Sequence, residues 1–231
     1  MGSDPWHALP NFWVGIGLPG LEHESTYQGY SLDRMPSVPI DLDDGIEWLR
    51  VHGTARPGEG LDRLDEFVCP LPAAAIIELS KQSDLALPAS FSRFMNSADL
   101  QSMVRSCTDC YLDPGQRVVE TIGSIPGHLV HFLSDSQSCA HWYVHILLNG
   151  CSAVLESPDL YCYQIENSDW MENPACRLER IDLEEVQMHF CAPTFSEFLF
   201  RFWIENEIWY ALNGDAAKRP LSSLENAYLR K

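Results

Sequence analysis

APTFSEFLFRFWIENEIWYALNG, residues 192–214, is the stretch of sequence that decides the fold. Thr194 and Glu197 form the T-x-x-E pattern of a capping box, in which two side chains accept hydrogen bonds from the free amides at a helix start. Asn213 and Gly214 supply a typical helix end. The spacing between them predicts a long helix whose broad apolar face packs on a sheet. That face comprises Phe195, Phe198, Leu199, Phe202, Trp203, Trp209 and Leu212.

Segments with strand-like alternation precede this helix. They are RVVETI (117–122), HLVHFL (128–133), HWYVHILL (141–148), SAVLES (152–157), LYCYQIE (160–166) and EVQMHFC (185–191). Short turns such as Asn149-Gly150 join several of them, which favours an antiparallel meander. The sequence therefore predicts an α+β protein with a central antiparallel sheet of about six strands, flanked by N-terminal helices and the long aromatic C-terminal helix.

Helical patterns occur on both sides of the strand region. We expect helices over residues 41–52 and 70–82, a short one opened by Leu87-Pro88, and a final one that begins near Ser222 or Ser223. The last helix is expected to be still running at Lys231, so the physical chain is expected to continue beyond it. Residues 1–35 are rich in Gly, Pro and aromatic side chains and have no periodicity. We interpret them as an extended arm laid on a single domain, residues 36–231.

The charge balance limits the classes of partner. Fifteen basic side chains against 33 acidic ones give a formal charge of −18, which repels phosphate backbones and disfavours nucleic-acid binding. The same field would speed the encounter with a basic protein, or it serves only to keep an aromatic-rich protein in solution. The sequence has no export signal or bilayer-spanning run. With eight scattered cysteines, this favours a cytoplasmic protein with reduced thiols and no membrane partner.

Two short motifs have the spacing of known chemical sites. Residues 15–20, GIGLPG, match G-x-G-x-x-G, but no amphipathic helix follows, so a dinucleotide site is disfavoured. Cys107 and Cys110 have the spacing of a zinc knuckle or a redox pair. A second ligand pair could come from His128 and His131 or from His141 and His145. No second C-x-x-C is present, and a turn follows Cys110, so the simpler interpretation is a pair of small side chains at the core edge.

The strand 141–148 places His141, Tyr143 and His145 on one face and Trp142 on the other. Histidines on one face could hold a metal, but they are more typical of hydrogen-bonded side chains on the wet face of an antiparallel sheet. No nucleophile elbow, P-loop or H-E-x-x-H motif occurs. The sequence therefore predicts a non-enzymatic protein with no catalytic residue, no metal and no cofactor. An enzyme or zinc protein that uses Cys107 and Cys110 remains the alternative.

Three passages carry a resemblance to a known family. They are LPASFSRFM at 87–95, GHLVHFLSDSQSCAHWYVHILLNG at 127–150, and FSEFLFRFWIENEIW at 195–209. Together they resemble the SUKH superfamily, which includes the yeast cell-wall-synthesis regulators and many bacterial immunity proteins. The first looks like the helix that the family places before its sheet. The second is similar to the family's strand pair, with Asp135 in the turn before the Trp142 strand.

The resemblance implies binding rather than catalysis. Members of the family are α+β domains, and many bacterial members are thought to neutralise toxins, nucleases among them, by direct contact. It implies a protein partner here, such as a basic toxin, or else a regulatory scaffold role in cell-envelope synthesis as in the fungal relatives. Asp135 and Trp142 are the candidate partner-binding residues, although packing in the core is the competing interpretation for Trp142.

Overall fold

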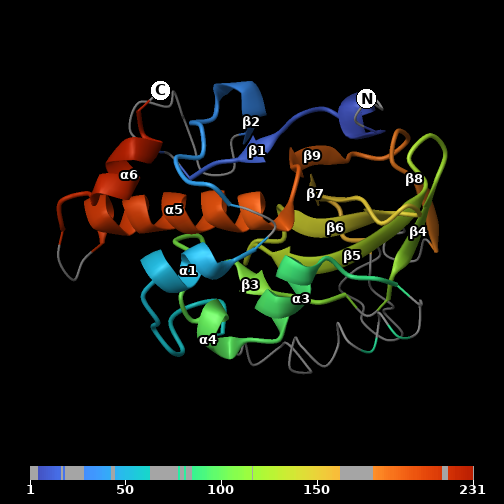
Figure 1. The fold of residues 1–231 in the computed structure, drawn as a ribbon. Helices are drawn as coiled ribbons and strands as arrows, with labels where there is room; N and C mark the ends of the chain where they lie inside the picture. The colour runs from blue at the N-terminus through green and yellow to red at the C-terminus, as the bar shows by residue number, and fades with distance from the viewer. Residues whose placement is uncertain are drawn as a thin grey trace.

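The computed structural model describes residues 5–16, 18, 29–42, 45–62, 78, 81, 85–115, 117–161, 179–214 and 218–230. Within these residues the chain is an α+β protein, as predicted: a long helix and several short ones accompany one large sheet (Figure 1). The helices are α1 (Glu47–His52), α3 (Ala89–Met95), α4 (Ala98–Gln101), α5 (Phe195–Asn213) and α6 (Ser223–Tyr228), with 3-10 turns at Pro5–Ala8 and Leu32–Arg34.

The large sheet has seven strands in the order β8-β4-β5-β6-β7-β9, and β3 pairs with β5 beside this path. The strands are β3 (Tyr111–Leu112), β4 (Val119–Ile122), β5 (Gly127–Ser134), β6 (His141–Leu147), β7 (Ser152–Ser157), β8 (Arg180–Asp182) and β9 (His189–Ala192). The meander from β4 to β7 is antiparallel, as the short turns predicted. The sheet as a whole is mixed, because β8 lies parallel to β4.

Side chains alternate between two buried faces along β6. Trp142, Val144 and Ile146 belong to the larger core, which also holds Phe91 of α3 and the aromatic residues of α5. Tyr143 belongs to a second core on the opposite face. The prediction of a wet histidine face is therefore wrong. His141 and His145 are 3% and 0% exposed.

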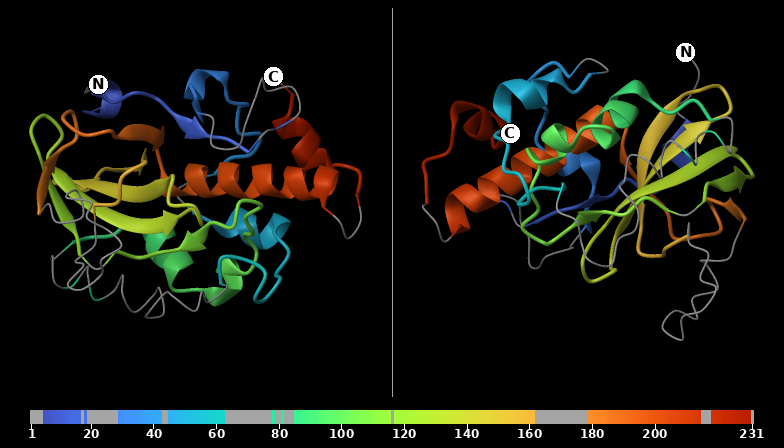
Figure 2. Two further views of the ribbon diagram at one scale, coloured as in Figure 1. Left: turned by 180° about the vertical axis from the view of Figure 1, so that it is seen from behind. Right: turned by 90° about the horizontal axis from the view of Figure 1, so that it is seen from below.

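The N-terminal segment covers that second face. Trp6 and Leu9 belong to its core, and the segment lies over the sheet on the side opposite α3 (Figures 1 and 2). The Trp6 indole Nε1 donates to His145 Nδ1 at 2.8 Å. Two backbone hydrogen bonds join Pro10 and Phe12 to Phe190 of β9. Farther along, β1 (Trp13–Val14) pairs with β2 (Gly29–Tyr30), and Trp13 enters the larger core.

Helix α5 is buried on nearly all sides. Fourteen of its 19 residues are buried, which is typical of a helix inside a protein rather than on its surface. Its first turns contact the sheet, where Phe198 packs against Phe132 and Trp142. Its later turns extend past the sheet between α1 and α6 (Figure 1). Phe200 packs against Trp48 of α1 and Tyr228 of α6.

The ends of α5 follow the sequence signals in part. The Thr194 hydroxyl accepts from the Glu197 amide at 3.1 Å, and Gly214 forms the C-cap. The Glu197 carboxylate accepts two hydrogen bonds from Arg201 one turn later. A reciprocal capping box is found instead at α6, between Ser222 and Glu225.

Other helices differ from the predictions in extent. Helix α1 occupies only the second half of the predicted 41–52 segment, and α6 ends at Tyr228 rather than running to Lys231. Most of the predicted helix 70–82 and most of the predicted strand 160–166 lie outside the described residues. Across the residues that are described, no helix is both long enough and apolar enough to span a bilayer.

Candidate functional site

The two residues predicted to contact a partner are buried. Asp135 is 0% exposed and Trp142 is 3% exposed. The Asp135 carboxylate accepts hydrogen bonds from the backbone amides of residues 137, 139 and 140, which fixes the β5–β6 turn. Trp142 packs against Phe198 and Phe202 of α5. A role in partner binding stays a prediction for both residues, with no exposed side chain to carry it.

Cys107 and Cys110 lie in the segment that joins α4 to β3. Cys110 is buried, and its sulfur lies 3.3 Å from the Thr108 hydroxyl. Burial, with the neighbouring Cys110 thiol, raises the pKa of Cys107 to about 12. Burial likewise raises the pKa of Cys110 to about 11. Among the described residues, no three His, Cys, Asp or Glu side chains gather as a metal site would require.

This chemistry predicts low thiol reactivity at Cys107. A pKa near 12, against an ordinary value of 9.0, leaves about a thousandfold less thiolate at pH 8. We expect iodoacetamide at pH 8 to alkylate the exposed Cys139 and Cys151 well before Cys107, as followed by peptide mass spectrometry. Labelling of Cys107 as fast as that of Cys139 would show an activated thiolate and would favour the redox or metal alternative.

A Ser-His-Asp group lies inside the protein. Ser134 Oγ donates to Asp113 Oδ2 at 2.9 Å and lies 2.8 Å from His141 Nδ1 and 3.1 Å from His131 Nε2. All four residues are at most 4% exposed. The serine proton points at a carboxylate rather than at a histidine base. The group links β5, β6 and the segment after β3 as a buried polar network.

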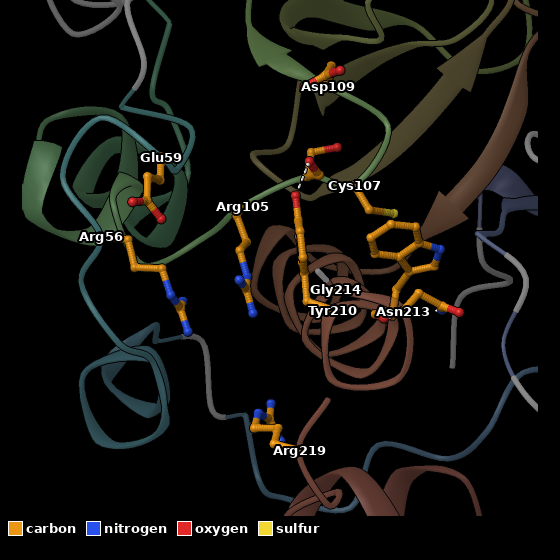
Figure 3. A pocket seen from close by; sticks show the side chains of 11 residues that line it. Arg56, Glu59, Arg105, Cys107, Asp109, Tyr210, Asn213, Gly214 and Arg219 are labelled. Atoms are coloured by element: carbon orange, nitrogen blue, oxygen red, sulfur yellow. Dashed lines mark hydrogen bonds between the residues drawn. The ribbon is translucent and has the colours of Figure 1, made fainter. Parts of the chain in front are cut away.

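A pocket lies at the C-terminal end of α5. Its volume is about 670 Å³. Three parts of the chain form it: the segment after α1, the segment between α4 and β3, and the last turn of α5 with the residues that lead to α6. The lining residues are Arg56, Glu59, Arg105, Ser106, Cys107, Asp109, Trp209, Tyr210, Asn213, Gly214 and Arg219 (Figure 3).

One buried carboxylate holds the three arginines of this pocket. Glu207 of α5 has a side chain that is 7% exposed. Arg105 binds it through Nε and Nη2, at 2.9 and 3.1 Å. Arg56 Nη1 lies 3.1 Å from Glu207 Oε1, and Arg219 Nη2 lies 3.5 Å from Oε2. Figure 3 shows the three arginines converging from separate segments. Because the carboxylate is buried, it fixes where each guanidinium lies.

Aromatic side chains form the adjoining wall. The Arg105 guanidinium lies 3.8 Å from the centroid of the Tyr210 ring, a cation–π contact. The Tyr210 hydroxyl donates to the Ser106 carbonyl at 3.0 Å, and burial raises the pKa of this phenol. Trp209 is only partly buried and lines the pocket. The sequence placed Trp209 on the core face of the helix, whereas the structure places it at the pocket.

The segment that carries Arg105 is itself held to α5. The Asn206 side chain accepts from the Cys107 amide at 2.6 Å and donates to the Phe202 carbonyl at 2.8 Å. Ser106 Oγ accepts from the amides of Thr108 and Cys110. These bonds give the pocket a fixed wall rather than a loose loop.

Sequence reasoning missed this pocket. Its central ion pairs join Glu207 to Arg105 and Arg56, which are 102 and 151 residues away in the chain. The one local indication of the pocket in the sequence was the aromatic pair Trp209-Tyr210 close to the end of the helix. Both residues are only partly buried in the structure. Comparison of the chain with protein-family models, curated proteins and solved structures gives no match, so the resemblance to the SUKH superfamily rests on the three sequence passages quoted above.

Proposed function

We propose that this chain is a non-enzymatic protein-binding module that neutralises a protein toxin by direct contact. The pocket at the end of α5 is the centre of the contact surface. The observation that carries the proposal is its lining: three arginines beside Trp209 and Tyr210. Arg, Trp and Tyr are the residue types that contribute most binding energy in protein interfaces.

The pocket is also prepared for binding before a partner arrives. Glu207 holds the arginine side chains, and Asn206 holds the segment behind them. A side chain that is already ordered loses little conformational entropy when it is covered. The arginine side chains of the pocket are therefore already ordered and lose little further entropy when a partner binds.

Charge and family resemblance support the rest of the proposal. The formal charge of −18 would steer a basic toxin toward the chain and would keep nucleic acids away. The resemblance to the SUKH superfamily implies the immunity role. The proposal places the chain in the cytoplasm with a protein partner, and assigns it no cofactor, metal or membrane surface. Its action would be steric, because the bound module covers the toxin surface that acts on the target.

The decisive experiment uses the product of the reading frame next to that of this chain. We expect it to be toxic when expressed alone, to lose toxicity when coexpressed with this chain, and to form a complex measurable by calorimetry. Trp209→Ala should weaken that complex roughly 30-fold or more, because it removes an aromatic anchor.

Leu148→Ala is the matched control, since Leu148 is 75% exposed in the β6–β7 turn and does not line the pocket. It should leave the affinity unchanged. Circular dichroism should show both variants folded. Equal affinities for the two variants would exclude the pocket as the contact surface, and the absence of any complex with a neighbouring gene product would contradict the immunity role.

A further inference from the structure

The charges inside the pocket cluster do not cancel. Arg56, Arg105 and Arg219 face two carboxylates, those of Glu207 and Glu225, whose side chains are 7% and 4% exposed. Arg219 holds Glu225 through both terminal nitrogens, at 2.7 and 2.5 Å. Three guanidinium groups against two carboxylates leave one positive charge in excess, in a chain whose total charge is −18.

The rim of the pocket does not neutralise this excess locally. Glu59 and Asp109 also line the pocket, but both residues are exposed to solvent. Water and salt screen exposed charges far more than partly buried ones. Arg56 and Arg105 lie deeper, since their side chains are 23% and 18% exposed, whereas that of Arg219 is 40% exposed. The excess positive charge therefore acts mainly on a group that enters the pocket.

Donors are available where the excess charge lies. Glu207 occupies Nε and Nη2 of Arg105, and Nη1 of Arg105 has no acceptor among the described residues. The guanidinium carbon lies 3.8 Å from the centroid of the Tyr210 ring and Glu207 binds the other two nitrogens, so the position of Nη1 is restricted. Arg56 Nη2 reaches Glu207 only at 3.5 Å, which is a weak hydrogen bond. An acceptor beside these two nitrogens would gain charge-assisted hydrogen bonds.

We propose that the pocket receives a carboxylate side chain, an Asp or Glu of the protein partner, beside Arg105 and Arg56. A monoanionic carboxylate brings the cluster to three positive and three negative groups. A phosphate dianion would exceed that balance, and a nucleic acid would meet the repulsion of the whole chain. Trp209 gives the methylene stem of such a side chain an apolar wall. This inference rests on the proposed function and names the chemistry of its contact.

The net negative charge of this chain repels an acidic side chain at long range, whereas the pocket binds one at short range. This difference makes the interface selective. Overall attraction brings a basic partner close, while only a partner with a carboxylate at one position can dock fully. A neutral side chain at that position would leave the excess charge unpaired on burial, which is unfavourable.

A titration with small probes tests the pocket without a partner. The probes are N-acetylglutamate N-methylamide and its uncharged match, N-acetylglutamine N-methylamide, observed through the arginine Nε and tryptophan Nε1 signals in nitrogen-15 NMR spectra. We expect saturable, millimolar binding of the glutamate probe, with shifts at Arg105 and Trp209, and no saturation with the glutamine probe, because a single partly exposed ion pair contributes little.

Three further arms make the titration decisive. Arg105→Gln and, separately, Arg56→Gln should each weaken binding of the glutamate probe. Arg180→Gln should not, since Arg180 pairs with Glu120 at the far edge of the sheet. Inorganic phosphate should shift the same signals less than the glutamate probe. Equal shifts from the glutamine probe, or stronger binding of phosphate, would overturn the assignment.

A double-mutant cycle with the partner separates this inference from the function itself. Each Asp or Glu on the partner's contact surface is changed to Asn or Gln and combined with Arg105→Gln. One acidic residue should show a coupling of about tenfold or more in Kd. A stable complex without such coupling would refute the carboxylate contact and leave the proposed function intact. Failure to form any complex would refute the proposed function. The probe titration would still test whether the pocket binds a carboxylate.

Discussion

Lowering the pH from 6.5 to 4.5 is expected to reduce the free energy of unfolding by about 3 to 5 kcal/mol. The main cause is a set of buried neutral histidines. Burial lowers the pKa of His131 to about 3, of His141 to about 4 and of His145 to about 3, from an ordinary value of 6.5. The unfolded chain takes up these protons below pH 6.5, while the folded protein does not, so acid favours unfolding.

Two buried carboxylates act in the opposite direction. Burial raises the pKa of Glu205 to about 7 and also raises that of Glu156. Between pH 7 and 4.5 the folded protein holds these protons more tightly than the unfolded chain, which stabilises the fold as the pH falls. Three histidines against two carboxylates leave a net uptake of about one to two protons on unfolding. Each proton corresponds to about 1.4 kcal/mol per pH unit.

His145 shows why protonation is unfavourable in the fold. Its Nδ1 accepts from the Trp6 indole, so Nε2 carries the proton and donates to Thr121 Oγ1 at 2.9 Å, and the Thr121 hydroxyl donates to the Ile125 carbonyl. A second proton on Nδ1 would face the indole N–H and remove one of the hydrogen bonds that hold the N-terminal segment. Acid should therefore loosen this segment as it destabilises the sheet.

Urea unfolding at pH 7.5, 6.5, 5.5 and 4.5 measures the effect. His145→Gln should make the pH dependence shallower by about 1.4 kcal/mol per pH unit, because one titrating group is lost. His52→Gln is the control, since His52 is exposed at the end of α1, and it should leave the slope unchanged. A free energy of unfolding that stays constant from pH 6.5 to 4.5 would contradict the prediction.

Local signals in the sequence were sufficient for much of the fold. The alternation of side chains predicted β4 to β7 to within two residues, and Asn149-Gly150 predicted their antiparallel pairing, because these features act over a few residues. The same holds for α5, whose N-cap Thr194 and C-cap Gly214 are both found in the structure. The two-residue β3 and three-residue β8 were not predicted, since alternation cannot be recognised over so short a run.

Contacts between segments far apart in the sequence could not be predicted from such local signals. The histidine face of β6 was predicted to be wet because alternation shows two faces but does not show what covers them. Trp6, 139 residues away, covers His145. The pocket is hidden for the same reason. A helix pattern places Trp209 on the side of Phe202, yet the later turns of α5 extend beyond the sheet (Figure 1), and Trp209 is only partly buried. Side-chain pattern therefore predicted elements well and the candidate site poorly.

Removing the carboxylate at the centre of the pocket should destabilise the whole protein. Glu207→Gln keeps the size of the side chain but leaves Arg56, Arg105 and Arg219 without their shared counter-charge. Breaking a buried ion pair on one side costs about 3 kcal/mol, because the remaining charges lose their compensation. In a chain of this length, such a loss lowers Tm by roughly 6–12 °C. The loss is large because one group joins the segment after α1, the segment after α4 and the approach to α6.

Glu59→Gln is the matched control for this prediction. Glu59 lines the same pocket and carries the same charge, but it is exposed, so its loss should change the free energy of unfolding by no more than about 0.5 kcal/mol. Both variants are to be compared by urea unfolding and calorimetry at pH 7.5. Equal stability of the two would mean that the arginines are satisfied by solvent instead. A large difference would mean that Glu207 both stabilises the end of α5 and sets the arginines in place for binding, since the same bonds perform both tasks.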